Sequence, residues 1–195
     1  MAMCCPQAPE RNGNMSEQNL AWKEIETEHL IQDEWLDFRK STYRMPDGSV
    51  WSPFYTYSRK DYVVIVATDE EGRYICVRQF RQGLREVTTE FPAGGVEPSE
   101  GSDHTLETAI RELREETGYE SDDWTFLMKI PANATISDNY AYLYQAKGCR
   151  PVTDQSLDAT EFVEVTTLTP GELEALIAQG GFQQAMHLLA LKLAK

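Results

Sequence analysis

Residues 94–119 read GGVEPSEGSDHTLETAIRELREETGY, a glycine-rich loop followed by a charged segment with helical spacing. The spacing predicts a helix over 104–117, with Ser102 or Asp103 as its N-terminal cap and Gly118 at its end. Small and aliphatic residues of this helix fall on one narrow stripe that we expect to face the core. The stripe consists of Leu106, Ala109, Ile110, Leu113 and Thr117.

Three carboxylates of the predicted helix lie outside this stripe. Glu112, Glu115 and Glu116 stand at positions i, i+3 and i+4, which places them within about 100° of arc. Like charges four residues apart cost about 0.2–0.5 kcal/mol, and negative charge in the last turns costs roughly 0.3–1 kcal/mol per residue. This unfavourable arrangement indicates a bound cation, and clustered carboxylate oxygens suit Mg²⁺ or Mn²⁺. A charged face exposed to solvent is the alternative interpretation.

The charge of the chain limits the classes of partner. Its 195 residues include 18 basic and 32 acidic ones, which give a formal net charge of −14. This charge repels polyanions and argues against a nucleic-acid-binding protein, so an anionic substrate needs local positive charge. Four arginines within thirteen residues can supply it: Arg73, Arg78, Arg81 and Arg85. A solvated basic strand is the alternative.

The composition, with 41% hydrophobic residues, is that of a globular protein with a real core. No run of eighteen apolar residues occurs, and the first residues lack the basic flank and apolar stretch of a signal peptide. The sequence therefore predicts a cytoplasmic protein with no membrane partner. Four cysteines without CxxC spacing favour reduced thiols over a zinc site; they are Cys4, Cys5, Cys76 and Cys149.

The organisation along the chain follows from turns and apolar runs. Residues 1–17 are polar and expected to be disordered. Residues 18–57 contain short strand-like runs and a turn at 46–48, which predict a small antiparallel β meander. Residues 58–195 are expected to form the main domain. Its other expected elements are strands over 62–67, 74–77, 124–130, 140–146 and 161–165, and helices over 170–178 and 182–194.

The loop and helix resemble the signature of the Nudix hydrolases, which reads Gly, five residues, Glu, seven residues and REUxEExGU, where U is a bulky aliphatic residue. Residues 111–118, RELREETG, match the tail of this signature position by position, and Tyr119 replaces the last aliphatic residue. Ten residues instead of seven separate Glu100 from Arg111. We expect the extra residues in the loop and first turn, with Glu100 or Asp103 as the first signature glutamate.

Two further segments resemble the ADP-ribose pyrophosphatase branch of this family. Residues 77–81, VRQFR, and residues 90–94, EFPAG, match its "QYR/QFR" strand and "ExPAG" loop. With the similar C-terminal part, the resemblance covers most of residues 22–195. It implies an α/β (α+β) fold, an α/β/α sandwich with a mixed sheet, and a homodimer in which the meander takes part and the partner contributes to the base pocket.

The same resemblance implies the metal ligands. Glu112 and Glu116 are expected to bind Mg²⁺, or alternatively Mn²⁺, with Glu115 at a second ion or its waters. The backbone carbonyl of Ala93 is expected to be a further ligand. Arg111 is expected to hold a carboxylate of the signature in place.

The resemblance also implies substrate contacts. Glu90 and Arg81 are expected to pair with each other or to reach the substrate phosphates, and Arg78 lies on the same strand end. Tyr62 is a candidate stacking face for the base, although an interior strand tyrosine is an equal alternative.

The loop at 154–161 is expected to supply the general base. Glu161 matches the end of the branch pattern, but Ala159 occupies a position that is often acidic. Asp158 and Glu115 are therefore alternatives to Glu161 for this role.

Together these features predict Mg²⁺-dependent hydrolysis of a nucleoside diphosphate sugar, with ADP-ribose, cleaved to AMP and ribose 5-phosphate, as the first candidate. GDP-mannose or another nucleotide sugar is the nearest competitor. A Nudix-type regulator that binds such ligands without cleaving them is the alternative of another class, and a plain interaction domain with an incidental acidic helix is the third. Both are disfavoured because the three signature glutamates are present and the final helices show no basic surface.

Overall fold

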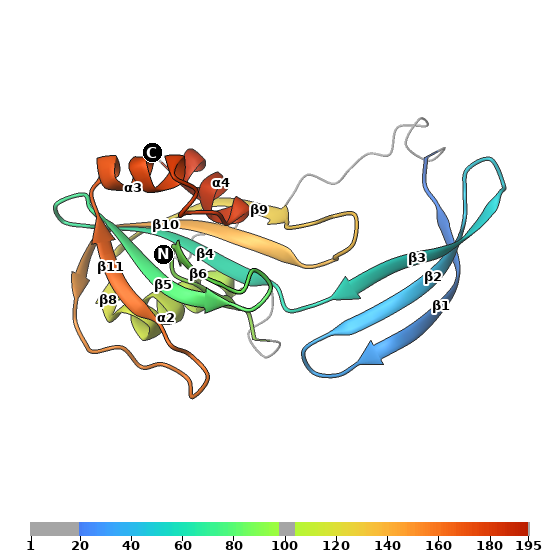
Figure 1. The fold of residues 1–195 in the computed structure, drawn as a ribbon, viewed down its shortest axis with the longest axis horizontal. Helices are drawn as coiled ribbons and strands as arrows, with labels where there is room; N and C mark the ends of the chain where they lie inside the picture. Colours follow the sequence, from blue (N-terminus) through green and yellow to red (C-terminus); the bar gives the residue numbers. More distant parts are fainter. Residues whose placement is uncertain (1–19, 98–103, 195) are drawn as a thin grey trace. The chain divides into compact units, whose positions relative to one another are not determined.

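The structure is a computed structural model that describes residues 20–97 and 104–194 (Figure 1). The chain divides into two compact units, one up to Tyr57 and one from Ser58 onward. The expected disordered tail, Cys4 and Cys5, the Ser102 or Asp103 cap, and the choice between Glu100 and Asp103 lie outside the described residues.

The first unit is a three-stranded sheet in the order β1–β2–β3. Its strands are β1 (Lys23–Gln32), β2 (Asp37–Arg44) and β3 (Val50–Ser58). The predicted antiparallel meander is present, and its turn ends at Gly48, whose φ of 86° is in the region that favours glycine. The Gly48 N–H donates to the Met45 carbonyl oxygen at 3.0 Å, which closes the turn.

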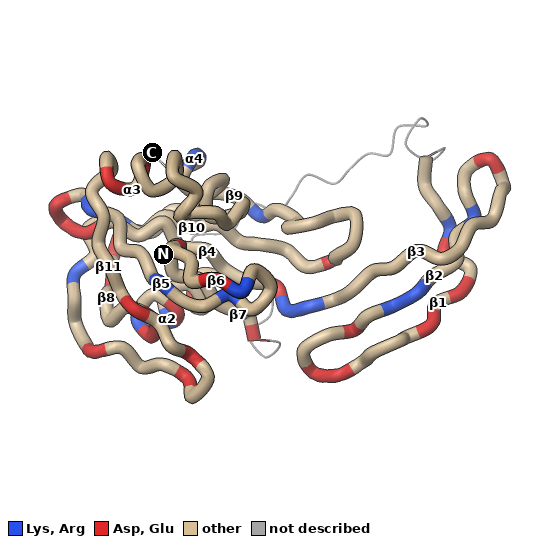
Figure 2. Tube along the Cα trace, in the orientation of Figure 1, with Lys and Arg blue, Asp and Glu red and all other residues tan. Residues whose placement is uncertain are grey.

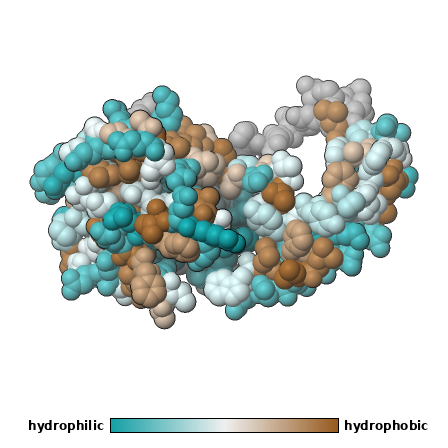
Figure 3. Space-filling view, in the orientation of Figure 1, coloured by the Kyte–Doolittle hydropathy of each residue, from teal (hydrophilic) through white to brown (hydrophobic). Residues whose placement is uncertain are grey.

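This small sheet buries little of its apolar surface. Among residues 20–57, Ser41 is the single fully buried side chain. Trp22, Tyr43 and Phe54 form an edge-to-face cluster, with the Trp22 and Phe54 ring centroids 5.2 Å apart. Trp51 nevertheless remains 61% exposed, and other apolar side chains of the unit are also on the surface (Figure 3).

The second unit is built on an eight-stranded mixed sheet with the central path β11–β5–β4–β10–β8. Its strands are β4 (Tyr62–Asp69), β5 (Tyr74–Arg81), β6 (Glu86–Glu90), β7 (Ala93–Gly95), β8 (Tyr119–Glu120), β9 (Asp123–Pro131), β10 (Tyr140–Pro151) and β11 (Glu164–Leu168). β4 and β10 are parallel, whereas β5, β7 and β9 pair antiparallel with their neighbours.

The described part of the second unit also contains three helices, namely α2 (Thr105–Thr117), α3 (Pro170–Ala178) and α4 (Ala185–Leu193). α2 ends at Gly118, whose φ is 76° and whose N–H donates to the Arg114 carbonyl oxygen, as the sequence predicts. α4 begins three residues later than predicted, because Phe182 is buried in the core before the helix starts and Gln184 is the N-cap residue.

The sheet separates two hydrophobic cores because alternate side chains of β4 point to opposite faces. Val63 and Ile65 belong to the core that includes Leu113 of α2. Val64 packs on the other face with Leu173 of α3 and with side chains of α4. α2 therefore covers one face and α3 and α4 the other, which confirms the predicted α/β/α sandwich (Figure 1).

The predicted core stripe of α2 is partly wrong. Leu106 and Ile110 are 38% and 40% exposed. The buried residues are instead Thr105, Thr108, Ala109, Glu112, Leu113, Glu116 and Thr117. This set still has helical spacing, but the buried face of the helix is turned toward the loop before it. Glu112 and Glu116 are therefore buried, although the predicted stripe placed them outside the core.

The last strand also differs from its prediction, since β11 begins at Glu164 instead of at 161. Residues before it are held at the end of α2, where the Gln155 side-chain amide donates to the backbone oxygens of Glu116 and Val163 at 2.6 and 3.2 Å. These bonds keep the preceding segment out of the sheet, so that pairing with β5 starts at Glu164 and Arg78.

Two cysteines lie within the described residues, and both Cys76 and Cys149 are buried and free. Burial raises the pKa of these thiols to about 12 and about 11, so both stay protonated at neutral pH. In residues 20–97 and 104–194, none of the helices combines the length and apolar character that crossing a membrane requires.

Candidate active site

Glu112 of α2 lies directly against the backbone of Gly94 in β7. A Cβ atom built on Gly94 would overlap the carboxyl group of Glu112, so only glycine allows this approach. Arg111 holds the carboxylate from the other side, with its Nη2 2.9 Å from Glu112 Oε1. The same guanidinium donates to the Gly95 carbonyl oxygen at 3.5 Å, which ties the helix to β7.

Glu116 lies one turn further along α2 and faces the same loop. Its side chain is 4% exposed, and its Oε2 accepts a hydrogen bond from the Ala93 backbone N–H at 3.0 Å. Ala93 is itself held in β7 by pairing with Val64 of β4. The two glutamates and the Ala93–Gly94 backbone therefore form one compact group, which we call the acid pair.

The acid pair is electrostatically unfavourable in the absence of a cation. Burial raises the pKa of Glu112 to about 7 and that of Glu116 to about 8, despite the opposing effects of Arg111 and of the Ala93 N–H. Glu161 raises both pKa values further through its negative charge. A positive ion between these groups would offset the cost of their burial.

The residues present fit a hard divalent cation. Within the described part of the chain, no three His, Cys, Asp or Glu side chains form a complete metal cage. Mg²⁺ does not need one, because it commonly takes one or two carboxylates and keeps places for water and substrate phosphates. The buried carboxylates of Glu112 and Glu116, next to the backbone of Ala93, are a donor set of this kind.

The raised pKa values predict how stability depends on pH and metal. In the unfolded chain the pKa values of these two carboxyls are near 4.5, whereas in the folded protein they are about 7 and 8. Between these pH values the folded protein therefore binds more protons than the unfolded chain does. Stability present at low pH should therefore be lost as the pH rises through this window.

We expect the Tm of the metal-free protein to fall toward pH 8, and Mg²⁺ to raise the Tm more at pH 8 than at pH 5. Thermal melts of the wild type and of the double variant Glu112→Gln, Glu116→Gln test this, since the variant should lose the slope. A wild-type Tm that is flat or rising over this range would contradict the assignment.

Glu115 does not join the acid pair. Its carboxylate is bound by Arg111 Nη1 at 2.7 Å and is 40% exposed. It lines a different cavity, on the outer side of α2, together with Ile110 and Arg114. The three glutamates that share an arc in the sequence thus divide into a buried pair and one outer residue, with Arg111 bound to Glu112 and Glu115.

Arg81 and Glu90 form an ion pair next to the acid pair. Arg81 Nε donates to Glu90 Oε1 at 2.8 Å, and the Glu90 side chain is completely buried. The second oxygen, Oε2, accepts from Gln184 Nε2 at 2.8 Å, so both carboxylate oxygens have a partner. The positive charge of Arg81 lowers the pKa of Glu116, which indicates that the two sites interact.

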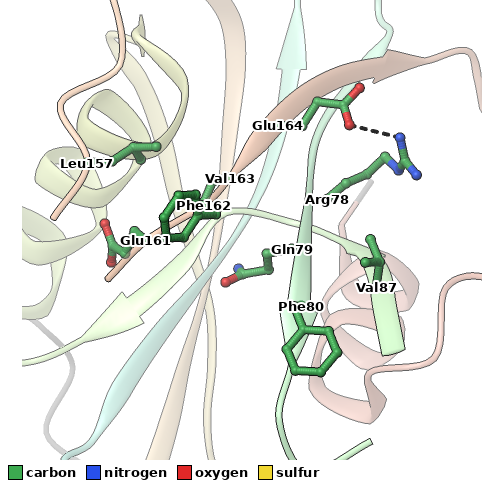
Figure 4. Close-up of a pocket in the computed structure, with 9 residues that line it drawn as sticks. All are labelled: Arg78, Gln79, Phe80, Val87, Leu157, Glu161, Phe162, Val163 and Glu164. Atoms are coloured by element: carbon green, nitrogen blue, oxygen red, sulfur yellow. Dashed lines mark hydrogen bonds and ion pairs between the residues drawn. The ribbon is translucent and has the colours of Figure 1, made fainter. Parts of the chain in front are cut away.

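A cavity of about 570 Å³ lies between β5 and the loop before β11 (Figure 4). It is lined by Arg78, Gln79, Phe80, Val87, Leu157, Glu161, Phe162, Val163 and Glu164. Arg78 Nη1 is 2.9 Å from Glu164 Oε2, and Phe162 is 86% exposed at the cavity. The cavity and the acid pair are adjacent, because the Gln155 side-chain amide donates both to the Glu116 carbonyl oxygen and to that of Val163, which lines the cavity.

The remaining predicted residues have clear positions. The Asp158 N–H donates to Glu161 Oε2 at 2.9 Å, and Asp158 is not among the residues that line the cavity. Tyr62 is half-buried against the core under α3 and α4, also away from the cavity lining. Of the four clustered arginines, Arg73 pairs with Asp69 at 2.8 Å on the far end of β5, while basic residues gather where β5 and β6 meet (Figure 2).

The sequence did not point to three polar residues that bind the backbone or side chains next to the acid pair. Gln155 binds the C-terminal end of α2, Gln184 binds Glu90, and His187 accepts a hydrogen bond from the Phe91 N–H. For His187 a signal was present, because a lone histidine in the leucine-rich stretch of α4 is unusual. Its partner could not be inferred, since it lies 96 residues away in the chain.

Comparisons with known proteins identify relatives of this chain. The family model of the NUDIX domain matches residues 58–188. An ADP-ribose pyrophosphatase of Bacillus subtilis (strain 168) is 30% identical over 152 residues, which cover 77% of this chain and 80% of that protein. A methanol dehydrogenase activator of Bacillus methanolicus is 29% identical over 171 residues, covering 87% and 90%. An ADP-sugar pyrophosphatase of Mus musculus is 33% identical over 109 residues, covering 50% and 49%.

A solved structure supports the fold. The crystal structure of an ADP compounds hydrolase superimposes with a TM-score of 0.77 and covers 89% of this chain and 92% of its own. The two sequences are 20% identical, so this match bears on the architecture alone.

Proposed function

The chain belongs to the NUDIX hydrolase family, and we propose that it cleaves the diphosphate of nucleoside diphosphate sugars with the help of a divalent metal ion. The observation that carries this proposal is the buried acid pair against the Ala93–Gly94 backbone, next to a cavity lined by Arg78 and Glu161. Buried carboxylates with raised pKa values in a cleft are typical of catalytic or metal-binding sites.

ADP-ribose is the first candidate substrate, with AMP and ribose 5-phosphate as the products. The curated relatives from Bacillus subtilis and mouse, named ADP-ribose pyrophosphatase and ADP-sugar pyrophosphatase, support this choice. GDP-mannose and other nucleotide sugars are the nearest alternatives. A non-catalytic regulator is disfavoured because Glu112 and Glu116 are both present and buried toward the loop.

Glu112 and Glu116, with the Ala93 carbonyl oxygen, would hold Mg²⁺ or Mn²⁺, and Arg111 would keep Glu112 oriented. When bound, the metal would supply positive charge to the phosphate oxygens and make a water molecule more acidic. Glu115 lies outside this group, so it would contact a second ion or its waters.

The reaction needs water to attack one phosphorus while the bridging P–O bond breaks. Glu161 is the proposed base, because it lines the cavity and its charge reaches the acid pair. It would take the proton from the attacking water and return it to the leaving phosphate. Asp158 and Glu115 remain alternatives. Arg78 and Arg81 would offset phosphate charge, although each is paired with an acid in this structure.

The substrate assignment predicts a higher kcat/KM for ADP-ribose than for any nucleoside triphosphate or dinucleoside polyphosphate. A diphosphate flanked on both sides would be bound by the arginines of β5 and by the cation that the acid pair would hold. A triphosphate brings extra negative charge to a chain at −14. Steady-state kinetics on a panel that includes GDP-mannose, with and without Mg²⁺, measure this. Preferential release of pyrophosphate from a triphosphate would overturn the substrate class but leave the family unchanged.

The proposed setting of this activity is the cytoplasm, with nucleotide sugars as the partners instead of nucleic acid. The charge of −14 supports the second point, because it disfavours binding to a polyanion. We also propose a homodimer to which the N-terminal sheet contributes. A three-stranded sheet whose apolar side chains remain exposed gains stability when a partner covers it.

If the protein is a homodimer, Trp51→Glu is expected to lower its molecular mass in solution. Trp51 is 61% exposed on β3, so a charge there should cost little within the sheet but disrupt an apolar interface. Light scattering after gel filtration should give about twice the chain mass of 22.2 kDa for the wild type and one chain mass for the variant. Gln32→Glu, at the exposed end of β1, is the control and should remain dimeric. A monomeric wild type would disprove the proposal.

A further inference from the structure

The C-terminal segment Gly181–His187 contacts the loop that carries Ala93 from the side opposite the acid pair. Three hydrogen bonds join the two segments. The Thr89 N–H donates to the Gly181 carbonyl oxygen at 3.4 Å, Gln184 Nε2 donates to Glu90 Oε2 at 2.8 Å, and the Phe91 N–H donates to His187 Nδ1 at 3.1 Å. Three successive residues, from the end of β6 into the loop, are thus each held by the segment before α4 or by α4 itself.

His187 is unusually well placed for this contact. It is 4% exposed, and its ring stacks on Phe91 with an interplanar angle of 9° while Phe182 packs edge-on against it. Burial lowers the pKa of His187 to about 3, so the ring is neutral at physiological pH and Nδ1 can accept a hydrogen bond. The bond satisfies a backbone N–H that would otherwise be buried without a partner.

The other side of the loop faces α2, the helix that carries Glu112 and Glu116. The Pro92 carbonyl oxygen accepts from the Ile65 N–H at 3.0 Å, and the Ala93 N–H donates to Glu116 Oε2 at the same distance. Ala93 is therefore held on one side by its pairing with Val64 and by the Pro92–Ile65 bond, while Gln184 and His187 hold the residues just before it on the other side. A loop fixed on one side only could shift by fractions of an ångström, which a metal site with strict geometry does not tolerate.

We propose that His187 and Gln184 are positioning residues that hold the Glu90–Ala93 loop in register with the acid pair, so that a divalent cation can bind both. This inference rests on the proposed metal-dependent function, since it concerns the loop that would supply the Ala93 carbonyl. Neither residue touches the reacting groups, and both act through Phe91 and Glu90.

Four variants of the full-length protein separate positioning from general stability. His187→Phe keeps a flat ring in the core but cannot accept the bond from Phe91. His187→Asn is the conservative rescue, because its amide oxygen can take the place of Nδ1. Gln184→Ala removes the bond to Glu90 from a half-buried position. Gln183→Ala is the control, since the neighbouring exposed amide reaches only Glu86.

The probes are Mn²⁺ alone, titrated by electron paramagnetic resonance, and hydrogen exchange of the Phe91 amide in protein labelled with ¹⁵N-phenylalanine. We expect His187→Phe to weaken Mn²⁺ binding by about tenfold or more, as is usual when support for a ligand is lost, and to speed exchange of the Phe91 amide. His187→Asn should recover most of both properties. Gln184→Ala should weaken Mn²⁺ binding less, and Gln183→Ala should match the wild type.

The inference is overturned if folded His187→Phe binds Mn²⁺ as the wild type does, or if His187→Asn is as impaired as His187→Phe. Should His187→Phe fail to fold, Gln184→Ala decides, because unchanged Mn²⁺ affinity in that variant also overturns the inference.

Turnover of ADP-ribose by the wild type is measured separately. A wild type that binds Mn²⁺ but cleaves no nucleotide sugar would end the proposed function, while the Mn²⁺ and exchange data would still decide the role of His187. A wild type that binds no Mn²⁺ would overturn both.

Discussion

Replacing Glu116 by glutamine is expected to lower kcat for ADP-ribose by about a hundredfold or more at saturating Mg²⁺. Glutamine keeps the size and helical tendency of the side chain but removes the charge that would bind the cation. The neutral amide can still accept from the Ala93 N–H, so the loop should stay in place. Without metal the variant should melt at a higher temperature, because an uncompensated buried carboxyl is removed.

The matched control for this experiment is Glu107→Gln on the same helix. Glu107 is exposed on the outer side of α2, where it pairs with His104 at 3.6 Å. The same chemical change there should leave kcat within a small factor of the wild type. Near wild-type turnover of Glu116→Gln at saturating Mg²⁺ would remove Glu116 from the metal site.

Replacing Gly94 by alanine is expected to abolish most activity, again by about a hundredfold or more, since the added methyl group would occupy the position of the Glu112 carboxyl group. Either the carboxylate or β7 must move, and both would separate Glu112 from Ala93. The half-saturating Mg²⁺ concentration should rise together with the loss of kcat. Kinetics at several Mg²⁺ concentrations, with circular dichroism to verify folding, measure both effects.

Gly95→Ala is the control for this substitution, because it adds the same methyl group one residue later. At Gly95 a Cβ would stand 3.6 Å from the Lys60 side chain, an ordinary contact distance. Its activity should therefore remain close to that of the wild type. If Gly94→Ala were as active as Gly95→Ala, the close packing of Glu112 on Gly94 would have no functional role.

The fold was largely predictable where local patterns are strong. The apolar run of β4, the turn ending at Gly48 and the Gly118 end of α2 are all at their predicted positions. Strands that sit between two helix layers read as continuous apolar runs, and glycines at positive φ mark turns, so these elements need little tertiary information. The start of β11 was not predictable, because the bonds of Gln155 to the end of α2 determine it.

The site was predictable in composition but not in orientation. Spacing on the helix singled out Glu112, Glu115 and Glu116, but hydrophobicity favoured Leu106 and Ile110 as core residues. The close approach of Gly94 rotates the helix instead, so that Glu112 is buried while Ile110 lines an outer cavity. Long-range partners such as His187 leave no local pattern, which explains why the support behind the loop was missed.

We propose that the acid pair, with a bound divalent cation, cleaves the diphosphate of a nucleotide sugar. The most direct measurement follows ADP-ribose by ³¹P nuclear magnetic resonance during incubation with the wild-type protein and Mg²⁺, before and after addition of a chelator. We expect the diphosphate signals to disappear while signals of AMP and ribose 5-phosphate grow in equal amounts, and we expect chelation to stop the reaction. Diphosphate signals that persist for every nucleotide sugar tested, or cleavage that continues unchanged in the chelator, would contradict it.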